Sequence, residues 1–233
     1  MRLWALLILV ALLCIATVPG IAQPTLKIVA YDGSQLRGAQ IRVSTLDGRV
    51  FEFTLDPSNP FVVRDVVKGV LFVEVVSWKS VPIGYRQNVT IYSDQTLVVP
   101  SIGKLTLKVS GSRGQALERA SIKIIYGGQT IEEGSTDAGG VYTTLLPAAS
   151  YGIVVEYGGR RVEKTIAVEP SRENVVNVQL DVFMSLGGMD LSLTEFLGLA
   201  LLVIVIVIAL IVVAVEYSNW RAKRARTVLA RPE

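Results

Sequence analysis

Hydrophobic side chains run without interruption near both ends of the chain and alternate with polar ones in between. The C-terminal run, Phe196 to Val215, contains 20 residues and no charge. As a helix it would be about 30 Å long, which matches the hydrocarbon core of a bilayer. The preceding "SLTE" at 192–195 has the pattern of a capping box, in which Ser and Glu side chains bind backbone amides of the first turn. We therefore predict a transmembrane helix over 195–216.

The N-terminal run has the features of a cleaved signal peptide. Residues 1–22 open with Arg2, continue through an apolar run of 16 residues, and close on the small residues Gly20 and Ala22. The alternative is an uncleaved N-terminal anchor, although 16 apolar residues are few for a bilayer. We expect a signal helix that is removed after export.

The segment between the two runs predicts strands rather than helices. Short alternating stretches are separated by turn signals about every ten residues, which is typical of an antiparallel β-sandwich. In "NVVNVQL", Val176, Val178 and Leu180 fall on one face of a strand, and Asn177 and Gln179 fall on the other. In the second half of this segment we place strands at 105–110, 120–126, 129–133, 141–145, 152–157, 161–168 and 174–180.

An internal repeat divides the same segment in two. "TLKIVAYDGSQLRGAQIRVS" from Thr25 aligns without a gap on "TLKVSGSRGQALERASIKII" from Thr106, at a constant offset of 81 residues. We therefore expect an all-β fold of two tandem antiparallel sandwiches, at 23–102 and 103–182, with a linker at 183–194.

The second repeat contains a clear turn signal, "STDAGGVY" at 135–142. We expect the side chains of Thr136 and Asp137 to bind local backbone, and Gly139 and Gly140 to adopt the positive φ that reverses the chain. A calcium loop is the alternative, but the neighbourhood offers few of the six or more oxygens that calcium needs. In the following "LPAASYGIVVEY", every second residue from Tyr151 to Val155 is predicted to face inward.

The succession of "GQALERASIKI", "STDAGGVY" and "LPAASYGIVVEYGG" resembles the carboxypeptidase-regulatory-like and collagen-adhesin B-type repeats, which are prealbumin-like, Ig-like sandwiches. The second repeat keeps most of the family pattern, although Ala149 or Ser150 stands where the family usually has glycine. The first repeat replaces the "TDxxGxY" turn by "TLDPSNPFVV". The resemblance implies the fold, while such modules serve as stalks, spacers and binding platforms without a shared active site. Because adhesin relatives can contain a lysine-to-asparagine isopeptide bond, it also makes Lys108 and Asn177 candidates by residue type.

Residues suited to catalysis are scarce. The chain has no histidine, and its one cysteine, Cys14, lies in the predicted signal peptide. The mature chain therefore has no disulfide, lacks the commonest transition-metal ligands, and cannot use histidine to activate a nucleophile. No phosphate-binding glycine loop of the "GxxxxGK" type occurs. We expect a protein that is not an enzyme and that uses no cofactor or metal.

Charge predicts the orientation in the membrane. Residues 216–233 contain five basic and two acidic groups, whereas residues 23–195 contain 17 basic and 18 acidic groups. A basic segment beside a transmembrane helix stays in the cytoplasm, so 217–233 is predicted to be a cytoplasmic tail and the domains to be extracellular. Nucleic-acid binding by the tail is the alternative, but headgroup attraction explains the same charges without it. The residues expected at the membrane interface are Tyr217, Trp220, Arg221, Lys223, Arg224 and Arg226.

Two surface features are candidates for binding. "SWKSVPIGYR" at 77–86 reads as an aromatic loop in which Trp78 and Tyr85 form an exposed anchor for a protein partner. The alternative, which we favour, is that Trp78 caps the core, as we expect of Tyr157 in the second repeat. "NVT" at Asn88 is a glycosylation sequon in an exported chain.

These features predict a non-catalytic plasma-membrane protein that presents two sandwiches at the cell surface for adhesion, envelope structure or protein binding. An accessory subunit of a transport, secretion or glycosylation complex is an alternative, and a carbohydrate-binding module is another. The partners we expect are the lipid bilayer and a protein, not a nucleic acid. The lack of histidine and of mature cysteine, together with many valines and isoleucines, favours a thermophilic prokaryote, with an archaeon as the best fit.

Overall fold

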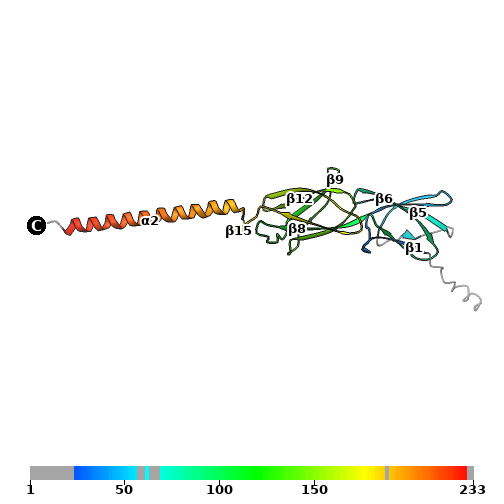
Figure 1. Cartoon of the computed structure of the whole chain (residues 1–233), viewed down its shortest axis with the longest axis horizontal. Helices are drawn as coiled ribbons and strands as arrows, with labels where there is room; N and C mark the ends of the chain where they lie inside the picture. Colours follow the sequence, from blue (N-terminus) through cyan, green and yellow to red (C-terminus); the bar gives the residue numbers. More distant parts are fainter. Residues whose placement is uncertain (1–23, 57–60, 63–68, 187–188, 230–233) are drawn as a thin grey trace, which may run out of the picture. The chain divides into compact units, whose positions relative to one another are not determined.

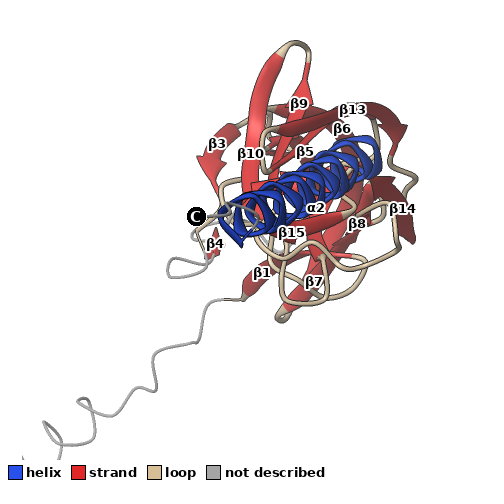
Figure 2. Ribbon diagram, turned by 90° about the vertical axis from the view of Figure 1, so that its left-hand side faces the viewer, coloured by secondary structure: helices blue, strands red, loops and turns tan. Residues whose placement is uncertain are grey.

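The structure, a computed structural model, describes residues 24–56, 61–62, 69–186 and 189–229, and describes the side chains of the C-terminal helix as far as Arg221. The predicted signal peptide at 1–22 and part of "TLDPSNPFVV" lie outside the described residues. The described chain is mostly β-strand and ends in a long helix (Figures 1 and 2).

The chain divides into two compact units. Unit 1 comprises the chain up to Gly103 together with Leu146–Ala148 and Glu169–Arg172. Unit 2 comprises Lys104–Leu145, Ala149–Val168 and the chain from Glu173 onward. The predicted domain limits of 23–102 and 103–182 remain an expectation, because two short segments of the second repeat group with unit 1.

Within its described residues, the first repeat forms seven strands in two sheets. A three-stranded sheet has the order β4-β1-β7, and a four-stranded sheet has the order β3-β2-β5-β6. The strands are β1 (Thr25–Ala30), β2 (Gln40–Thr45), β3 (Val50–Thr54), β4 (Phe61–Val62), β5 (Gly69–Trp78), β6 (Val81–Ile91) and β7 (Gln95–Val99).

The second repeat forms another seven strands with the same connections. Its sheets have the orders β11-β8-β14 and β10-β9-β12-β13, so each strand pairs like the strand seven places before it. The strands are β8 (Ile102–Ser110), β9 (Ser121–Tyr126), β10 (Gln129–Ser135), β11 (Val141–Pro147), β12 (Ser150–Tyr157), β13 (Arg160–Ala167) and β14 (Glu173–Gln179). All seven strands predicted in this repeat are confirmed, with ends that differ by at most three residues.

Alternating residues from both sheets of the second repeat make its core. Ile122 and Ile124 of β9 and Tyr151 and Ile153 of β12 are at most 1% exposed. Leu105, Leu107 and Val109 of β8 in the other sheet are at most 2% exposed. The predicted inward positions of β12, including Val155, are confirmed, and burial of these side chains is the main stabilising contribution.

The expectation of purely antiparallel sheets is wrong. β1 pairs in parallel with β7, and β8 pairs in parallel with β14. In each case the first and last strands of a repeat lie side by side. Hydrophobic alternation identifies strands locally but does not say which distant strand is the neighbour, so the sequence did not reveal these pairs.

In the "STDAGGVY" turn, the predicted bonds of Asp137 to local backbone are confirmed, whereas the predictions for Thr136 and Gly139 are not. Asp137 Oδ1 accepts hydrogen bonds from the amides of Gly139 (2.9 Å) and Val141 (2.8 Å). Gly140 alone of the two glycines has a positive φ, of 70°. Thr136 does not bind local backbone, because its buried hydroxyl accepts from the amide of Ala120 (2.8 Å) and donates to the carbonyl of Leu117 (2.5 Å).

Residues 183–194, expected as a linker, contain two short strands, β15 (Met184–Leu186) and β16 (Met189–Leu191), which pair antiparallel. The helix α2 then runs over Leu193–Leu229, so it begins before the predicted 195 and continues through most of the predicted tail. The segment Leu193–Arg221 is long and apolar enough to cross a membrane, and its most apolar window has no residue buried against the rest of the protein.

Candidate functional site

The outer face of the four-stranded sheet in unit 1 bears a row of four charges that crosses all its strands. The register places Glu52 of β3 opposite Arg42 of β2, then Glu74 of β5 and Arg86 of β6. Arg42 Nε lies 2.7 Å from Glu52 Oε1, and its Nη1 lies 3.2 Å from Glu74 Oε2. Arg86 Nη2 lies 2.9 Å from Glu74 Oε1. We call these four residues the charge ladder.

The middle of the charge ladder is shielded and its two ends face solvent. Side-chain exposure is 16% for Glu74 but 65% for Glu52 and 76% for Arg86. The hydrogen bond from Arg86, reinforced by Arg42, lowers the pKa of Glu74 below its ordinary value. The ladder therefore ends in an accessible carboxylate on β3 and an accessible guanidinium on β6.

β3 also exposes apolar side chains, which is unusual for the outer strand of a sheet. Val50 is 56% exposed and Phe51 is 42% exposed. Phe72 of β5, at 41%, lies in the same register row as Val50, and that row ends at Asn88 of β6. Lysine, proline or a bulge commonly protects such an edge, and β3 has none of the three.

The corresponding row of unit 2 has a different charge pattern. Topology matches β3, β2, β5 and β6 to β10, β9, β12 and β13. The register there runs from Glu133 through Lys123 and Val154 to Glu163. Both ends of this row are acidic, so the oppositely charged ends are a property of the unit 1 sheet.

Trp78 and Tyr85, the predicted binding pair, do not lie in a long loop. β5 and β6 are joined by a two-residue turn at Lys79 and Ser80, both with positive φ. Trp78 is 6% exposed and donates from Nε1 to the carbonyl of Arg37 at 2.8 Å. The premise of an exposed tryptophan is wrong, because the indole completes the core, as the alternative interpretation expected.

Tyr85 and Asn88 lie on β6, the edge strand of the four-stranded sheet. Tyr85 is half-buried, and its hydroxyl donates to Gln87 Oε1. Asn88 is exposed, so its amide is accessible to a modifying enzyme. Partner binding by Tyr85 and glycosylation of Asn88 stay predictions.

The start of α2 is joined to the second repeat by a specific set of contacts. Glu195 Oε2 accepts from the amide of Ser192 at 2.8 Å, and Ser192 Oγ accepts from the amide of Glu195 at 3.2 Å, which confirms the capping box. Arg160 of β13 forms an ion pair with Glu195. The rings of Phe183 and Phe196 lie 5.3 Å apart. A residue that caps the helix thus also binds the sandwich.

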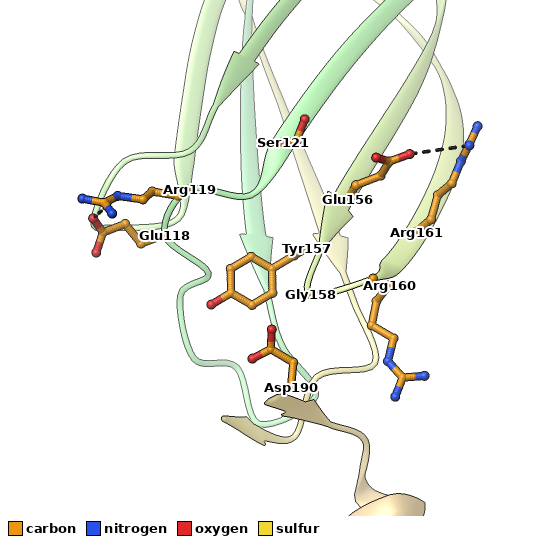
Figure 3. Close-up of a pocket in the computed structure, with 10 residues that line it drawn as sticks. Glu118, Arg119, Ser121, Glu156, Tyr157, Gly158, Arg160, Arg161 and Asp190 are labelled. Atoms are coloured by element: carbon orange, nitrogen blue, oxygen red, sulfur yellow. Dashed lines mark ion pairs between the residues drawn. The ribbon is translucent and has the colours of Figure 1, made fainter. Parts of the chain in front are cut away.

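A pocket of about 690 Å³ lies beside this junction (Figure 3). Tyr157 and Asp190 face the hollow, whereas Arg119 and Arg161 point away from its centre. Gly158 has φ +53°, and a Cβ there would collide with the Asp190 side chain, so the turn fits only glycine. The pocket arginines already have carboxylate partners: Arg119 pairs with Glu118, Arg160 with Glu195, and Arg161 with Glu156 and Glu163. The pocket has no group of converging charges that would select a ligand.

The predicted interface residues lie at the far end of α2. Tyr217 and Trp220 are 61% and 49% exposed, and their rings lie 6.2 Å apart. Arg221 ends the part of the helix whose side chains are described, and the side chains of Lys223, Arg224 and Arg226 lie outside it.

Lys108 and Asn177 are register partners on β8 and β14. Both are exposed on the outer face of the sheet, and they do not lie within the core. Among the residues that the structure describes, no group of three or more Asp, Glu, Cys or His side chains is placed to hold a metal ion.

No family model matches the sequence, and no curated protein matches it. The structure is similar to the minor pilin GBS52 of Streptococcus agalactiae, at 15% identity and a TM-score of 0.32, over 67% of this chain and 95% of that one. A streptococcal ancillary pilin matches at 14% and 0.36, over 68% of each chain. The shaft pilin spaA of Lactobacillus rhamnosus GG matches at 9% and 0.34, over 70% of this chain and 100% of that one. At such identities and TM-scores the likeness carries no conclusion about what this chain binds.

Proposed function

We propose that this chain is a non-catalytic, single-pass membrane protein that presents two β-sandwich units at the outer cell surface for contact with other proteins. The observation that carries the proposal is helix α2, whose apolar residues between Leu197 and Val215 remain exposed on every side. A helix that is apolar all round is stable in a bilayer and unfavourable in water.

The distribution of charge supports an orientation with the units outside. Arg221 and the four basic residues that follow it lie C-terminal to the apolar helix, while the strand-rich segment is nearly neutral. The capping box at Ser192 and Glu195 supports a helix that begins at a membrane surface, because it satisfies amides that the hydrocarbon core would leave unpaired.

The binding role is supported by where the accessible side chains lie. The charge ladder and Val50 of β3 lie together on the outer face of the unit 1 sheet, away from the core of that unit. The pocket in unit 2, by contrast, has its arginines neutralised by neighbouring carboxylates. A surface that binds proteins agrees with these features better than a site that converts a small molecule.

Limited proteolysis of right-side-out vesicles tests the orientation. With an epitope tag after Glu233, external protease should remove the strand-rich segment and leave a tagged fragment that contains the helix. Vesicles opened with detergent serve as the control in which the tag is also lost. Protection of the strand-rich segment in sealed vesicles would contradict the proposal.

A further inference from the structure

The two ends of the charge ladder are complementary in charge, so one end can bind the other end of a second copy. It reads Glu52, Arg42, Glu74, Arg86 from the β3 edge to the β6 edge, so its signs alternate and its two ends are opposite. If the β3 edge of one copy lies beside the β6 edge of another, Glu52 meets Arg86 and the alternation continues without a break.

Strand direction allows this contact without distorting either sheet. β3 pairs antiparallel with β2, β2 with β5, and β5 with β6. After three reversals β3 and β6 run in opposite directions. A second copy that is rotated to follow the twist of the sheet therefore places its β3 antiparallel to β6, which is the arrangement that forms regular hydrogen bonds between strands.

Both edges are open within the described part of unit 1, where β3 and β6 are the outer strands of the sheet. Continuing the observed register rows across the seam pairs Glu52 with Arg86 and Val50 with Asn88 on the outer face. On the inner face it pairs Phe53 with Tyr85. The seam combines an ion pair, an aromatic pair and backbone hydrogen bonds, which are the terms that stabilise neighbouring strands.

We propose that unit 1 of one copy binds unit 1 of another by joining β3 to β6, so that the four-stranded sheet continues from chain to chain. The two contacting edges differ, so in a pair one copy keeps its β3 edge free and the other keeps its β6 edge free. Further copies can therefore add in a row. The outer row of unit 2, with Glu133 and Glu163 at its ends, would place like charges together and does not favour this contact.

The seam is short, so we expect weak association in solution and stronger association where copies are concentrated. Anchoring in a membrane supplies that concentration, and to this extent alone the inference rests on the proposed function. The experiment is therefore done both at high concentration in detergent micelles and in vesicles. If the helix did not anchor the protein in a membrane, the cross-linking expected in micelles would be unchanged.

Mixed disulfide cross-linking tests the geometry. Cys14 is the sole cysteine, so C14S provides a thiol-free background. Chains with V50C and chains with N88C should cross-link when mixed, because directly opposed antiparallel residues lie within disulfide range. V50C alone and N88C alone should not. The matched control in unit 2 mixes T130C chains with T165C chains. Thr130 and Thr165 lie at the two ends of the unit 2 row that corresponds to the row from Val50 to Asn88, and these chains should not cross-link.

Charge reversal tests the chemistry of the same seam. E52R alone and R86E alone should each lower the cross-linking yield about tenfold or more, since each sets like charges against each other. Mixing V50C/E52R chains with N88C/R86E chains should restore the yield, because the reversed charges again face opposites. Both replaced side chains are largely exposed, so the fold should persist, which circular dichroism checks. E133R in unit 2 is the control that should change nothing.

The outcomes separate cleanly. Cross-linking of V50C only with N88C, together with rescue by the paired reversals, supports the head-to-tail seam. Equal cross-linking of V50C with itself would indicate a symmetric dimer and overturn it. Absence of cross-linking in both micelles and vesicles, or no rescue by chains that are folded, would overturn it as well.

Discussion

At the scale of single residues, two neighbours in one turn show how far a local pattern can be interpreted. Asp137 binds the amides of Gly139 and Val141, as its position before two glycines suggests. Thr136, one position earlier and directly after β10, instead binds the backbone of Leu117 and Ala120 in the segment that precedes β9. A hydroxyl serves near and distant backbone equally well, so only the fold decides which it binds.

The buried hydroxyl of Thr136 gives the first prediction. Thr136→Val keeps the shape but leaves the amide of Ala120 and the carbonyl of Leu117 without this partner, at a cost of about 1–3 kcal/mol in the free energy of unfolding. Denaturant unfolding of the purified chain measures the loss, and Thr136→Ser, which keeps the hydroxyl, is the control. A loss in Thr136→Ser as large as that in Thr136→Val would contradict this prediction, because serine keeps the hydroxyl.

At the scale of secondary-structure elements, local signals predicted the elements and missed their partners. The strands of the second repeat and the capping box follow from alternation and from the "SLTE" spacing, which need only neighbouring residues. The turn at Lys79 and Ser80 was missed because neither residue is the glycine or asparagine that usually marks positive φ. The charge ladder was missed because its four members become neighbours only once the register of β2, β3, β5 and β6 is known.

The junction between β13 and α2 gives a prediction at this scale. Arg160→Gln removes the ion pair with Glu195 and should loosen the first turn of α2 relative to the sandwich, while the capping bonds with Ser192 remain. Solvent screens an exposed pair and leaves it little effect on stability, so we expect a change in mobility rather than in melting.

Spin labels at Lys164 and Leu197 measure this effect as a broader distance distribution. Arg161→Gln is the matched control, because Arg161 pairs with Glu156 and Glu163 and makes no ion pair with the helix. Equal broadening in the two variants would show that Arg160 does not position the helix.

At the scale of the whole molecule, the repeat gives two units with the same strand connections and different surfaces. The cores preserve the pattern, since Leu26, Ile28 and Ile41 are as buried as Leu107, Val109 and Ile122. The ends of the outer charge rows diverge, with Glu52 and Arg86 in one unit and Glu133 and Glu163 in the other. Packing constrains the inner faces alike and leaves each outer face able to acquire its own contacts.

The separate pair of sheets in each repeat predicts that the second repeat folds on its own. A fragment of residues 103–181 should unfold cooperatively and give a β-type circular dichroism spectrum, because its seven strands close their own pair of sheets. A molten or helical spectrum would contradict this prediction.

The parallel pairing of first and last strands has a mechanical consequence. In each repeat, β1 beside β7 and β8 beside β14 run in the same direction, so the chain enters at one end of the pair and leaves at the other. A pull on the two ends of a repeat loads all the hydrogen bonds between these strands together, in shear, rather than opening them one after another. A chain held by its helix in a bilayer and pulled from its far end would therefore resist force first at these two strand pairs. Each repeat would then unfold abruptly at a high force, rather than gradually as one hydrogen bond after another broke.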